Sequence, residues 1–566
     1  MLVPDSSQEH PPTSRAFVRL AIIIALASMV FFFRLGVADW RGDADTQLAQ
    51  IIQDIVAGRG WVLPLRNGRH IPDKPPLASW LGAASALVRQ SGGDTFDARL
   101  PSALLATLCV IAVYAFAHSL AGESVGWWAA LMLITTPQFV IAARDSRVDM
   151  TFCAFLTLGL TLAWRVYDGN GGHRTALFAG LCFGLAVLSK GPLALALPVM
   201  IFGATALLAP PRPGWRTLVA FPAVTASIGP PALWYLAATV EQGRAFLRLH
   251  FVDENVSRLT GGLGRWPAWF YIGPLLSLGL PWTVALPGVV SGGSVLPSRS
   301  RRFLWTWVIV MFVVFSISGG KRRVYLLPLR PALAILLAGW LAPQLARLGG
   351  LRRAVSTPRA VHLVTGGFVV AALLCALAFR MGLGGFGASA QQWSYWWRLY
   401  LGEYLISVVL FIVGVGIGAD LIVGWTWQRR FDLAAYGLVG MLVLGWTLGL
   451  SSDEIARGEA LSFRPLAQRV SAEVGPTEPL AFLDVDDETA ICFLYHLGRH
   501  VPVVQSVDGQ PCTPPGPGAY LIAESTWDER VCASNPRWHF VVRGGPEITT
   551  HRGQRLVLAR FEGAPN

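Results

Sequence analysis

Charged residues are scarce in this 566-residue chain. Only 14% of its positions are Asp, Glu, Lys or Arg, whereas 53% are apolar, and an ordinary soluble protein carries about 25% charged residues. This shortage excludes a water-soluble globular enzyme, and the high apolar content excludes a disordered chain. The sequence also lacks a glycine-rich nucleotide loop, a P-loop pattern, internal repeats and low-complexity tracts.

Long apolar runs are abundant instead. They reach about 20 residues, the length that crosses a hydrocarbon core, and therefore indicate a polytopic α-helical membrane protein. The first run lacks a signal-peptide cleavage site and is expected to be retained. We expect thirteen spans, at residues 17–35, 98–118, 124–142, 148–166, 175–189, 193–209, 216–238, 269–290, 303–318, 324–342, 361–379, 401–424 and 433–451.

The arginines predict the orientation of these spans. The net charge is +12, but many arginines lie in short loops between apolar runs, which is typical of the positive-inside bias and not of nucleic-acid binding. Residues 298–302, the loop after 342 and residues 429–430 fall on one side, which is therefore predicted to be cytoplasmic. The other side, where we expect the chemistry, receives loops 36–97, 143–147, 239–268, 319–323 and 380–400 and everything after 451.

Two extracytoplasmic parts have structure of their own. Apolar residues between Leu48 and Val56 repeat at helical spacing, which predicts an amphipathic surface helix in loop 36–97. After residue 451 the composition becomes that of a soluble protein, with helices expected at 461–474 and 488–497 among short strands. We therefore expect a transmembrane domain at 1–451 and a small α/β domain at 452–566.

The seven cysteines give no metal-binding pattern. Cys109, Cys153, Cys182 and Cys375 lie in apolar runs and are expected to act as small buried hydrophobic residues. Cys492, Cys512 and Cys532 lie in the C-terminal region, where an extracytoplasmic location would permit a Cys512–Cys532 disulfide.

Three aspartates, Asp39, Asp43 and Asp45, cluster where the first span ends. Helix capping explains one of them but not all three, so we expect Asp43 or Asp45 to be functional. Downstream, prolines fix the backbone around Asp73-Lys74-Pro-Pro. A lysine held there suits a phosphate group as a point charge, and the alternative is a lysine that snorkels beside a turn.

Further ionisable residues stand at the extracytoplasmic ends of later spans. Placing an acid such as Asp149 at the edge of an apolar run costs free energy, so we expect such a residue to have a function. Lys190-Gly-Pro and Lys321-Arg-Arg-Val-Tyr325 occupy tight turns, and the three cations of the second turn lie on the side that the positive-inside bias disfavours. A bound anion would account for them. Converging cations beside carboxylates suit a phospholipid-linked substrate.

These segments, in this order, resemble the polyprenyl-phosphate-dependent glycosyltransferases of the GT-C type. The nearest branch contains the bacterial transferases that add 4-amino-4-deoxy-L-arabinose to lipid A, which are related to protein O-mannosyltransferases. The resemblance covers spans one to ten and rests on the early acid cluster, Trp61–Pro64, Asp73-Lys-Pro-Pro, Ala98-Arg-Leu-Pro-Ser, Asp149, Lys190-Gly-Pro, Glu254-Asn-Val-Ser-Arg258, Pro281-Trp282 and Phe315–Tyr325.

The resemblance implies roles for individual residues. It makes Asp43 or Asp45, together with Asp149, catalytic, and it assigns the donor phosphate to Lys74, Lys190, Arg258, Lys321 and Tyr325. The family's first-loop pair is usually Asp-Glu, whereas Ala44 and Asp45 align with it here, so the choice between Asp43 and Asp45 stays open. Where the lipid A enzymes carry a candidate Glu and His metal pair, this chain has Asp73 and Asn255, which leaves Asp73 as the candidate ligand of a divalent metal. No other cofactor is implied.

The predicted function is that of a monomeric glycosyltransferase in the bacterial inner membrane. It would move a sugar from a polyprenyl phosphate of undecaprenyl type to lipid A or another envelope acceptor on the periplasmic face, where the C-terminal domain also lies. The alternatives are transfer to a hydroxyl of a protein or another glycan, and a lipid or sugar transporter without chemistry. A transporter predicts inverted repeats with broken spans in matching halves, which the sequence lacks.

Overall fold

The computed structural model describes residues 12–40, 43–70, 74–212, 214–248, 250, 266–349 and 405–483, a few isolated positions between 349 and 405, and shorter stretches from 485 to 561. Most of the described chain is helical. The helices of the bundle are α1 (Pro12–Phe32), α4 (Thr95–Ala121), α5 (Glu123–Thr135), α6 (Pro137–Ala143), α7 (Val148–Tyr167), α8 (His173–Lys190), α9 (Leu193–Leu208), α10 (Phe221–Gln242), α15 (Ser298–Ile317), α16 (Arg330–Gly349), α19 (Leu405–Trp427) and α20 (Phe431–Leu444).

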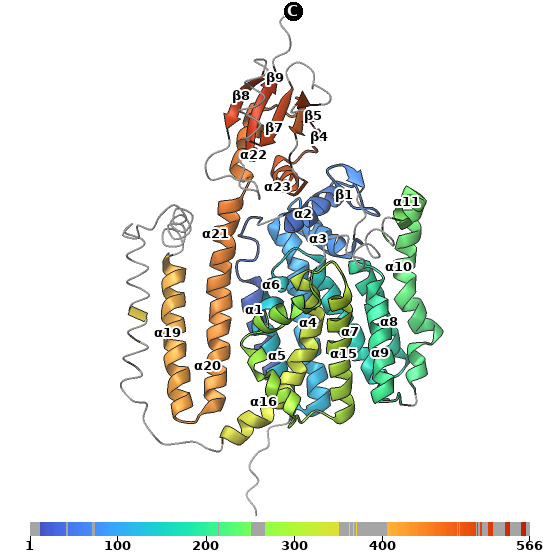
Figure 1. Cartoon of the computed structure of the whole chain (residues 1–566), viewed down its shortest axis with the longest axis vertical. Helices are drawn as coiled ribbons and strands as arrows, with labels where there is room; N and C mark the ends of the chain where they lie inside the picture. The colour runs from blue at the N-terminus through green and yellow to red at the C-terminus, as the bar shows by residue number, and fades with distance from the viewer. Residues whose placement is uncertain are drawn as a thin grey trace, which may run out of the picture.

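Shorter helical segments connect these helices. They are η1 (Trp215–Leu218), α11 (Arg244–Leu247), η3 (Ala268–Tyr271), α13 (Ile272–Ser277), η4 (Trp282–Ala285), α14 (Leu286–Ser291), η5 (Arg323–Leu329) and η6 (Gly445–Leu450). Helix α20 continues through η6 into α21 (Ser451–Leu461), and Figure 1 shows this long helix leading from the bundle towards the C-terminal sheet.

Twelve of the thirteen predicted spans fall on a helix or on successive helices, and the remaining one, 361–379, lies outside the described residues apart from four isolated positions. Within the described chain, seven helices are long and apolar enough to cross a membrane, or up to nine if each bent pair counts as one span. The structure therefore supports a polytopic helical protein without fixing the number thirteen.

Two predicted spans are bent helix pairs. Helices α5 and α6 meet at 67°, and the segment Ala268–Ser277 meets Trp282–Ser291 at 106°. At the first bend Thr136 has extended backbone and Pro137 begins the next helix. This arrangement follows from proline chemistry, because proline disfavours a helical conformation in the residue before it but suits a first helical position.

The core of the bundle is formed by large aromatic residues and by close helix contacts. Trp164 of α7 stacks on Phe303 of α15 with ring centroids 4.4 Å apart. Gly180 and Gly184 of α8 face the backbone of α10, and a Cβ at Gly180 would lie 2.2 Å from the Ala223 carbonyl oxygen. Small residues permit this close helix packing, which fixes the positions of the helix ends around the site.

The loop between α1 and α4 forms a separate layer on one end of the bundle. It contains α2 (Asp43–Val56), the hairpin of β1 (Leu65–Arg66) and β2 (Arg69–His70), and α3 (Leu77–Arg89). Helix α2 is amphipathic, as its sequence pattern predicts, and buries Leu48, Ala49, Ile52 and Ile55. The hairpin was not predicted, because its strands are only two residues long.

The C-terminal region forms a mixed α/β unit beyond this layer (Figure 1). The elements are α22 (Arg464–Glu473), β3 (Leu480–Leu483), α23 (Asp487–Leu497), β4 (Val503–Val504), β5 (Ser506–Val507), β6 (Gln510–Pro511), β7 (Tyr520–Glu524), β8 (Trp538–Arg543) and β9 (Leu556–Phe561). The sheet has the order β4-β3-β7-β9-β8, with β3 parallel to β4 and β7, and β9 antiparallel to β7 and β8. The apolar pattern predicts strands at 480–484, 502–507, 519–523, 539–542 and 556–561. Four of them are found as β3, β7, β8 and β9, whereas 502–507 is divided into β4 and β5, which belong to different sheets.

Candidate active site

A cavity of about 160 Å³ opens between the surface layer and the helix ends. Its wall is formed by α2, residues on both sides of the β-hairpin, the start of α3, the start of α7 with the two residues before it, the end of α8, and η5 with the residue before it. The lining carries four cations and one carboxylate among otherwise neutral groups. The lining residues are Gln47, Leu48, Ile51, Pro64, Lys74, Pro75, Ser79, Ser146, Arg147, Val148, Asp149, Lys190, Arg322, Val324 and Tyr325.

Asp149 and Lys190 form the centre of this wall. The Lys190 Nζ donates to Asp149 Oδ1 at 2.5 Å, and the two side chains are only 13% and 12% exposed. The pairing follows from the chain path, because α7 and α8 are joined by a short turn, so the beginning of α7 lies beside the end of α8. An acid in the first turn and a base in the last turn also complement the two helix dipoles.

Aromatic rings surround the same ammonium group. The Lys190 Nζ lies 4.6 Å from the Tyr325 ring centroid and 5.3 Å from that of Phe152. Beyond Lys190 the chain reverses at Gly191, which has a φ of +100°, a conformation that favours glycine. The predicted turn at Lys190-Gly-Pro is therefore found, and it places the lysine inside the cavity wall together with the predicted residue Tyr325.

Lysine is rare in this chain. Only three of its 46 basic residues are lysines, namely Lys74, Lys190 and Lys321, and all the others are arginines. Two of the three line the cavity. A lysine presents a compact point charge, whereas an arginine presents a broad planar fork, so the composition indicates that these sites require the smaller cation.

The third lysine points elsewhere. The Lys321 ammonium donates to the backbone carbonyls of Ser316, at 2.8 Å, and Ser318, at the end of α15. The side chain is buried, and loss of water lowers the pKa of Lys321. Its neighbour Arg322 is the residue of this turn that lines the cavity.

Asp45, in the first turn of α2, contacts two residues of the cavity wall, Ser146 and Arg147. Its carboxylate Oδ1 lies 3.7 Å from the Arg147 Nε, which is also 3.7 Å from Asp145 Oδ2. The Ser146 hydroxyl donates to the Asp45 backbone carbonyl at 2.9 Å. Sequence analysis did not single out Arg147, although its position two residues before Asp149 was a usable signal.

Several predicted residues lie outside the described part. These are Asp73, Arg258 and the cysteines of the suggested disulfide, Cys512 and Cys532, while Asp43 begins α2 with a side chain that is not described. Among the described residues, no group of three or more His, Cys, Asp or Glu is arranged to hold a metal ion. The suggested metal role of Asp73 thus stays a prediction.

The third aspartate of the early cluster serves the C-terminal region. Asp39 is 6% exposed. Its carboxylate accepts from the Ser462 hydroxyl at 2.5 Å and lies 3.4 Å from Arg464 and 3.6 Å from the His496 Nε2. These partners are more than 420 residues away in sequence, so the sequence alone could not assign this role.

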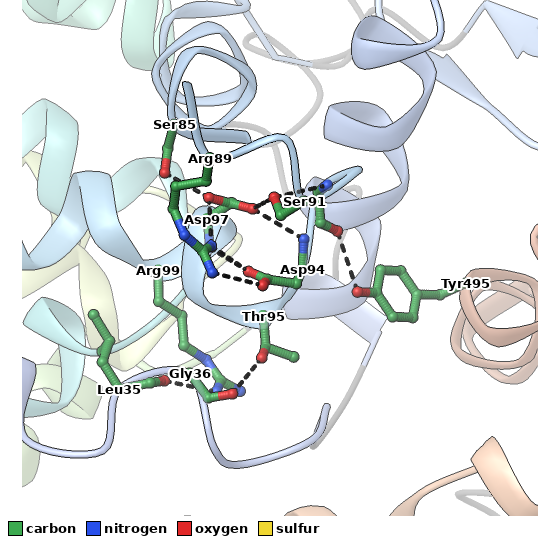
Figure 2. Close-up of polar contacts among 11 residues, drawn as sticks. Leu35, Gly36, Ser85, Arg89, Ser91, Asp94, Thr95, Asp97, Arg99 and Tyr495 are labelled. Atoms are coloured by element: carbon green, nitrogen blue, oxygen red, sulfur yellow. Dashed lines mark hydrogen bonds and ion pairs between the residues drawn. The ribbon is translucent and has the colours of Figure 1, made fainter. Parts of the chain in front are cut away.

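Further contacts attach α23 and its flanks to the surface layer. Asn67 exchanges two hydrogen bonds with the backbone of Val501, at 2.6 and 2.9 Å. The Tyr495 hydroxyl donates to the Gly93 carbonyl at 3.2 Å, as Figure 2 shows. The C-terminal unit therefore packs directly on the layer that carries α2.

Two buried arginines hold this layer and its neighbours to the bundle. Arg99, from the Ala98-Arg-Leu-Pro-Ser motif, donates to the Leu35 carbonyl at 3.1 Å (Figure 2) and to the Ala38 carbonyl at 2.7 Å. Arg144 donates to carbonyls at the end of α1 and pairs with Glu454 of α21 at 2.7 Å. Both arginines have structural partners and lie outside the cavity lining.

Comparison with protein families gives one match. The profile described as "Dolichyl-phosphate-mannose-protein mannosyltransferase" matches residues 73–240. That range contains Lys74, Asp149 and Lys190, three of the residues that line the cavity.

Curated relatives are bacterial transferases. The chain is 27% identical over 372 residues to undecaprenyl phosphate-alpha-4-amino-4-deoxy-L-arabinose arabinosyl transferase 2 of Pseudomonas fluorescens, covering 64% of this chain and 63% of that protein. It is 30% identical over 322 residues to the corresponding transferase of Pseudomonas aeruginosa, covering 54% of this chain and 56% of that one. The matched part thus spans roughly three-fifths of the relatives' length.

A solved structure agrees over nearly the whole length. The crystal structure of ArnT from Cupriavidus metallidurans bound to undecaprenyl phosphate matches with a TM-score of 0.74 at 20% identity, covering 98% of this chain and 100% of that one. Its apo structure gives a TM-score of 0.72. The resemblance predicted from the sequence motifs is confirmed, and this chain has the GT-C fold of the polyprenyl-phosphate-dependent glycosyltransferases.

Proposed function

We propose that this chain is a membrane glycosyltransferase that takes a sugar from a polyprenyl phosphate. The observation that carries the proposal is the cavity, where Lys74, Lys190 and Arg322 converge beside Asp149 in a partly enclosed site. Such a site suits an anionic lipid-linked donor, because preorganised cations stabilise the charge that develops on the leaving phosphate. The named relatives use undecaprenyl phosphate 4-amino-4-deoxy-L-arabinose, which makes this compound the first donor to test.

In the proposed reaction an acceptor oxygen attacks the anomeric carbon of the sugar. The bond between that carbon and the phosphate oxygen breaks, and undecaprenyl phosphate leaves with the electron pair. Lys74 and Arg322 would stabilise this charge, and Tyr325 and the Asp149–Lys190 pair would shape the site. Arg258 keeps the donor-binding role that the resemblance implies, whereas we propose that Arg322 takes that role in place of Lys321. One well-placed donor in such a site is worth about 3–4 kcal/mol.

The role of the first-loop acid depends on the acceptor. A hydroxyl acceptor must lose its proton, and Asp45 or Asp43 would take it as general base. A lipid A phosphate is already ionised, and the acid would then only orient it. Lipid A is the acceptor we propose first, and a protein hydroxyl is the second, favoured by the description of the family profile that matches residues 73–240.

The proposed orientation in the membrane rests on the positions of the arginines. The bundle end opposite the cavity carries Arg299, which pairs with Asp168 at 2.8 Å, and Arg302, which donates to the Leu208 carbonyl. Because arginines concentrate on cytoplasmic ends, we place the cavity, the surface layer and the domain at 452–566 on the periplasmic side of the inner membrane. The protein would act there as a monomer with the domain at 1–451 as its catalytic part.

The test is mass spectrometry of lipid A and total glycolipids from cells with and without the chain. We expect a sugar increment that disappears on deletion and returns with the wild-type chain but not with Lys74→Ala or Asp149→Asn at equal membrane levels. Arg469→Met, which removes an exposed arginine of α22 in the C-terminal region, is the matched control and should restore the increment. Full restoration by both cavity variants would refute the proposed site.

A further inference from the structure

We propose that Arg147 is a positioning residue that holds the Asp45 carboxylate against the cavity wall, where Asp45 acts as the first-loop acid of the transfer. This inference rests on the proposed glycosyl transfer. It concerns an arginine that the sequence motifs leave without a role, although it lies in the cavity wall.

The geometry around Arg147 is the first argument. Its Nε stands at 3.7 Å from both Asp45 Oδ1 and Asp145 Oδ2, and its side chain is 29% exposed. The two carboxylates come from different elements, α2 and the connection between α6 and α7. One guanidinium thus joins the first turn of the surface helix to the helical bundle.

The backbone supports the same connection. The Ser146 hydroxyl donates to the Asp45 backbone carbonyl at 2.9 Å. Two consecutive residues therefore hold the first turn of α2: Ser146 binds the backbone of Asp45, and Arg147 pairs with its carboxylate. Two residues further on, Asp149 pairs with Lys190 in the cavity. The short segment 146–149 therefore fixes the distance between the α2 acid and the cationic wall.

Charge is the third argument. Arg147 lines the cavity together with Lys74, Lys190 and Arg322, and it forms an ion pair with Asp45. A guanidinium keeps its positive charge in proteins, so Arg147 gives the Asp45 carboxylate a constant partner on the side of the cavity. Positioning of this kind matters because a misplacement of about 1 Å can cost about 100-fold in rate.

The experiment is a double-mutant cycle on the full-length protein in liposomes, with undecaprenyl phosphate 4-amino-4-deoxy-L-arabinose as donor and lipid A as acceptor. The variants are Arg147→Met, Asp45→Asn and the double variant, with Arg147→Lys as the conservative replacement and Arg469→Met, at an exposed arginine of α22, as control. We expect Arg147→Met to lower kcat about 10- to 100-fold, with the donor KM within about twofold. Arg147→Lys should recover part of the loss, and Arg469→Met should match the wild type.

The decisive result is the coupling. In the Asp45→Asn background, Arg147→Met should cause less than about a twofold further loss, because the two residues act as one unit. Equal losses in both backgrounds would overturn the inference, as would a raised donor KM with unchanged kcat, which would make Arg147 a donor ligand. If Arg147→Met does not fold, the same comparison is made with Arg147→Lys. If the wild-type protein transferred no sugar, that result would refute the proposed function. Failure of the inference about Arg147 can therefore be distinguished from failure of the proposed function.

Discussion

Neutralising Asp149 alone should destabilise the protein as well as stop transfer, because the change leaves the Lys190 ammonium buried without its carboxylate. The two groups are 2.5 Å apart and only 12–13% exposed. Removing one partner of a buried ion pair costs about 3–5 kcal/mol, whereas replacing both partners by neutral groups of similar volume is often close to neutral. Asp149→Asn should therefore be clearly less stable than Asp149→Asn with Lys190→Met.

Stability and activity should separate in these variants. The double variant should regain most of the lost stability and still fail to transfer sugar, because the ammonium near Tyr325 is gone. Thermal unfolding in detergent, followed by tryptophan fluorescence, measures the first quantity, and donor consumption measures the second. Glu123→Gln is the control, since Glu123 is 31% exposed and pairs with Arg19 at the surface, where such a pair is worth at most about 1 kcal/mol.

Two results would refute this reasoning. Equal stability of wild type and Asp149→Asn would mean that the pair is not an interdependent buried unit. Full transfer activity in the double variant would mean that the Lys190 charge plays no part in the reaction.

Three further predictions follow from individual contacts. Arg322→Met should raise the donor KM, because Arg322 lines the cavity. Lys321→Met should instead lower the melting temperature with little change in KM, because its ammonium binds backbone carbonyls. Kinetic and thermal measurements that gave the reverse pattern would identify Lys321 as the donor ligand. Burial and the nearby Arg464 lower the pKa of His496 against the opposing effect of Asp39, so the stability contributed by the neutral ring should decline as the pH falls below about 6.5, the unfolded value. His496→Gln should flatten this decline in unfolding scans between pH 7.5 and 5, and an unchanged slope would contradict the assignment. Arg144→Met should reduce stability by about 3–5 kcal/mol because it removes one partner of the buried Arg144–Glu454 ion pair, and an unchanged melting temperature would show that this pair is not needed.

The helices could be predicted because their signal is local. Apolar runs marked twelve helical regions, and the helical period of α2 was evident from a few residues. The bends were harder, because the runs at 124–142 and 269–290 keep their hydrophobicity through a break in the helix. A proline in the second half of such a run was the available warning.

The site was predicted residue by residue, but its contacts were not. Asp149 and Lys190 stood out because each is an ionisable group at the end of an apolar run, where it is costly, and Lys74 stood out because prolines fix the backbone around it. Which group each one faces depends on long-range packing. Asp39 looked like a member of the acid cluster, yet its carboxylate binds Ser462 and Arg464 of the C-terminal region. Lys321 looked like a phosphate ligand, and its ammonium lies on the carbonyls of its own turn.

Reconstituted transfer tests the central claim most directly. Purified full-length protein in liposomes would receive undecaprenyl phosphate 4-amino-4-deoxy-L-arabinose and lipid A, and mass spectrometry would follow both lipids, with Lys74→Ala as the inactive comparison. We predict that the wild type releases undecaprenyl phosphate and adds the sugar mass to the acceptor in equal amounts, and that Lys74→Ala does neither. An intact donor and an unmodified acceptor with folded wild-type protein, while the same donor is consumed by the Pseudomonas aeruginosa relative, would contradict this account.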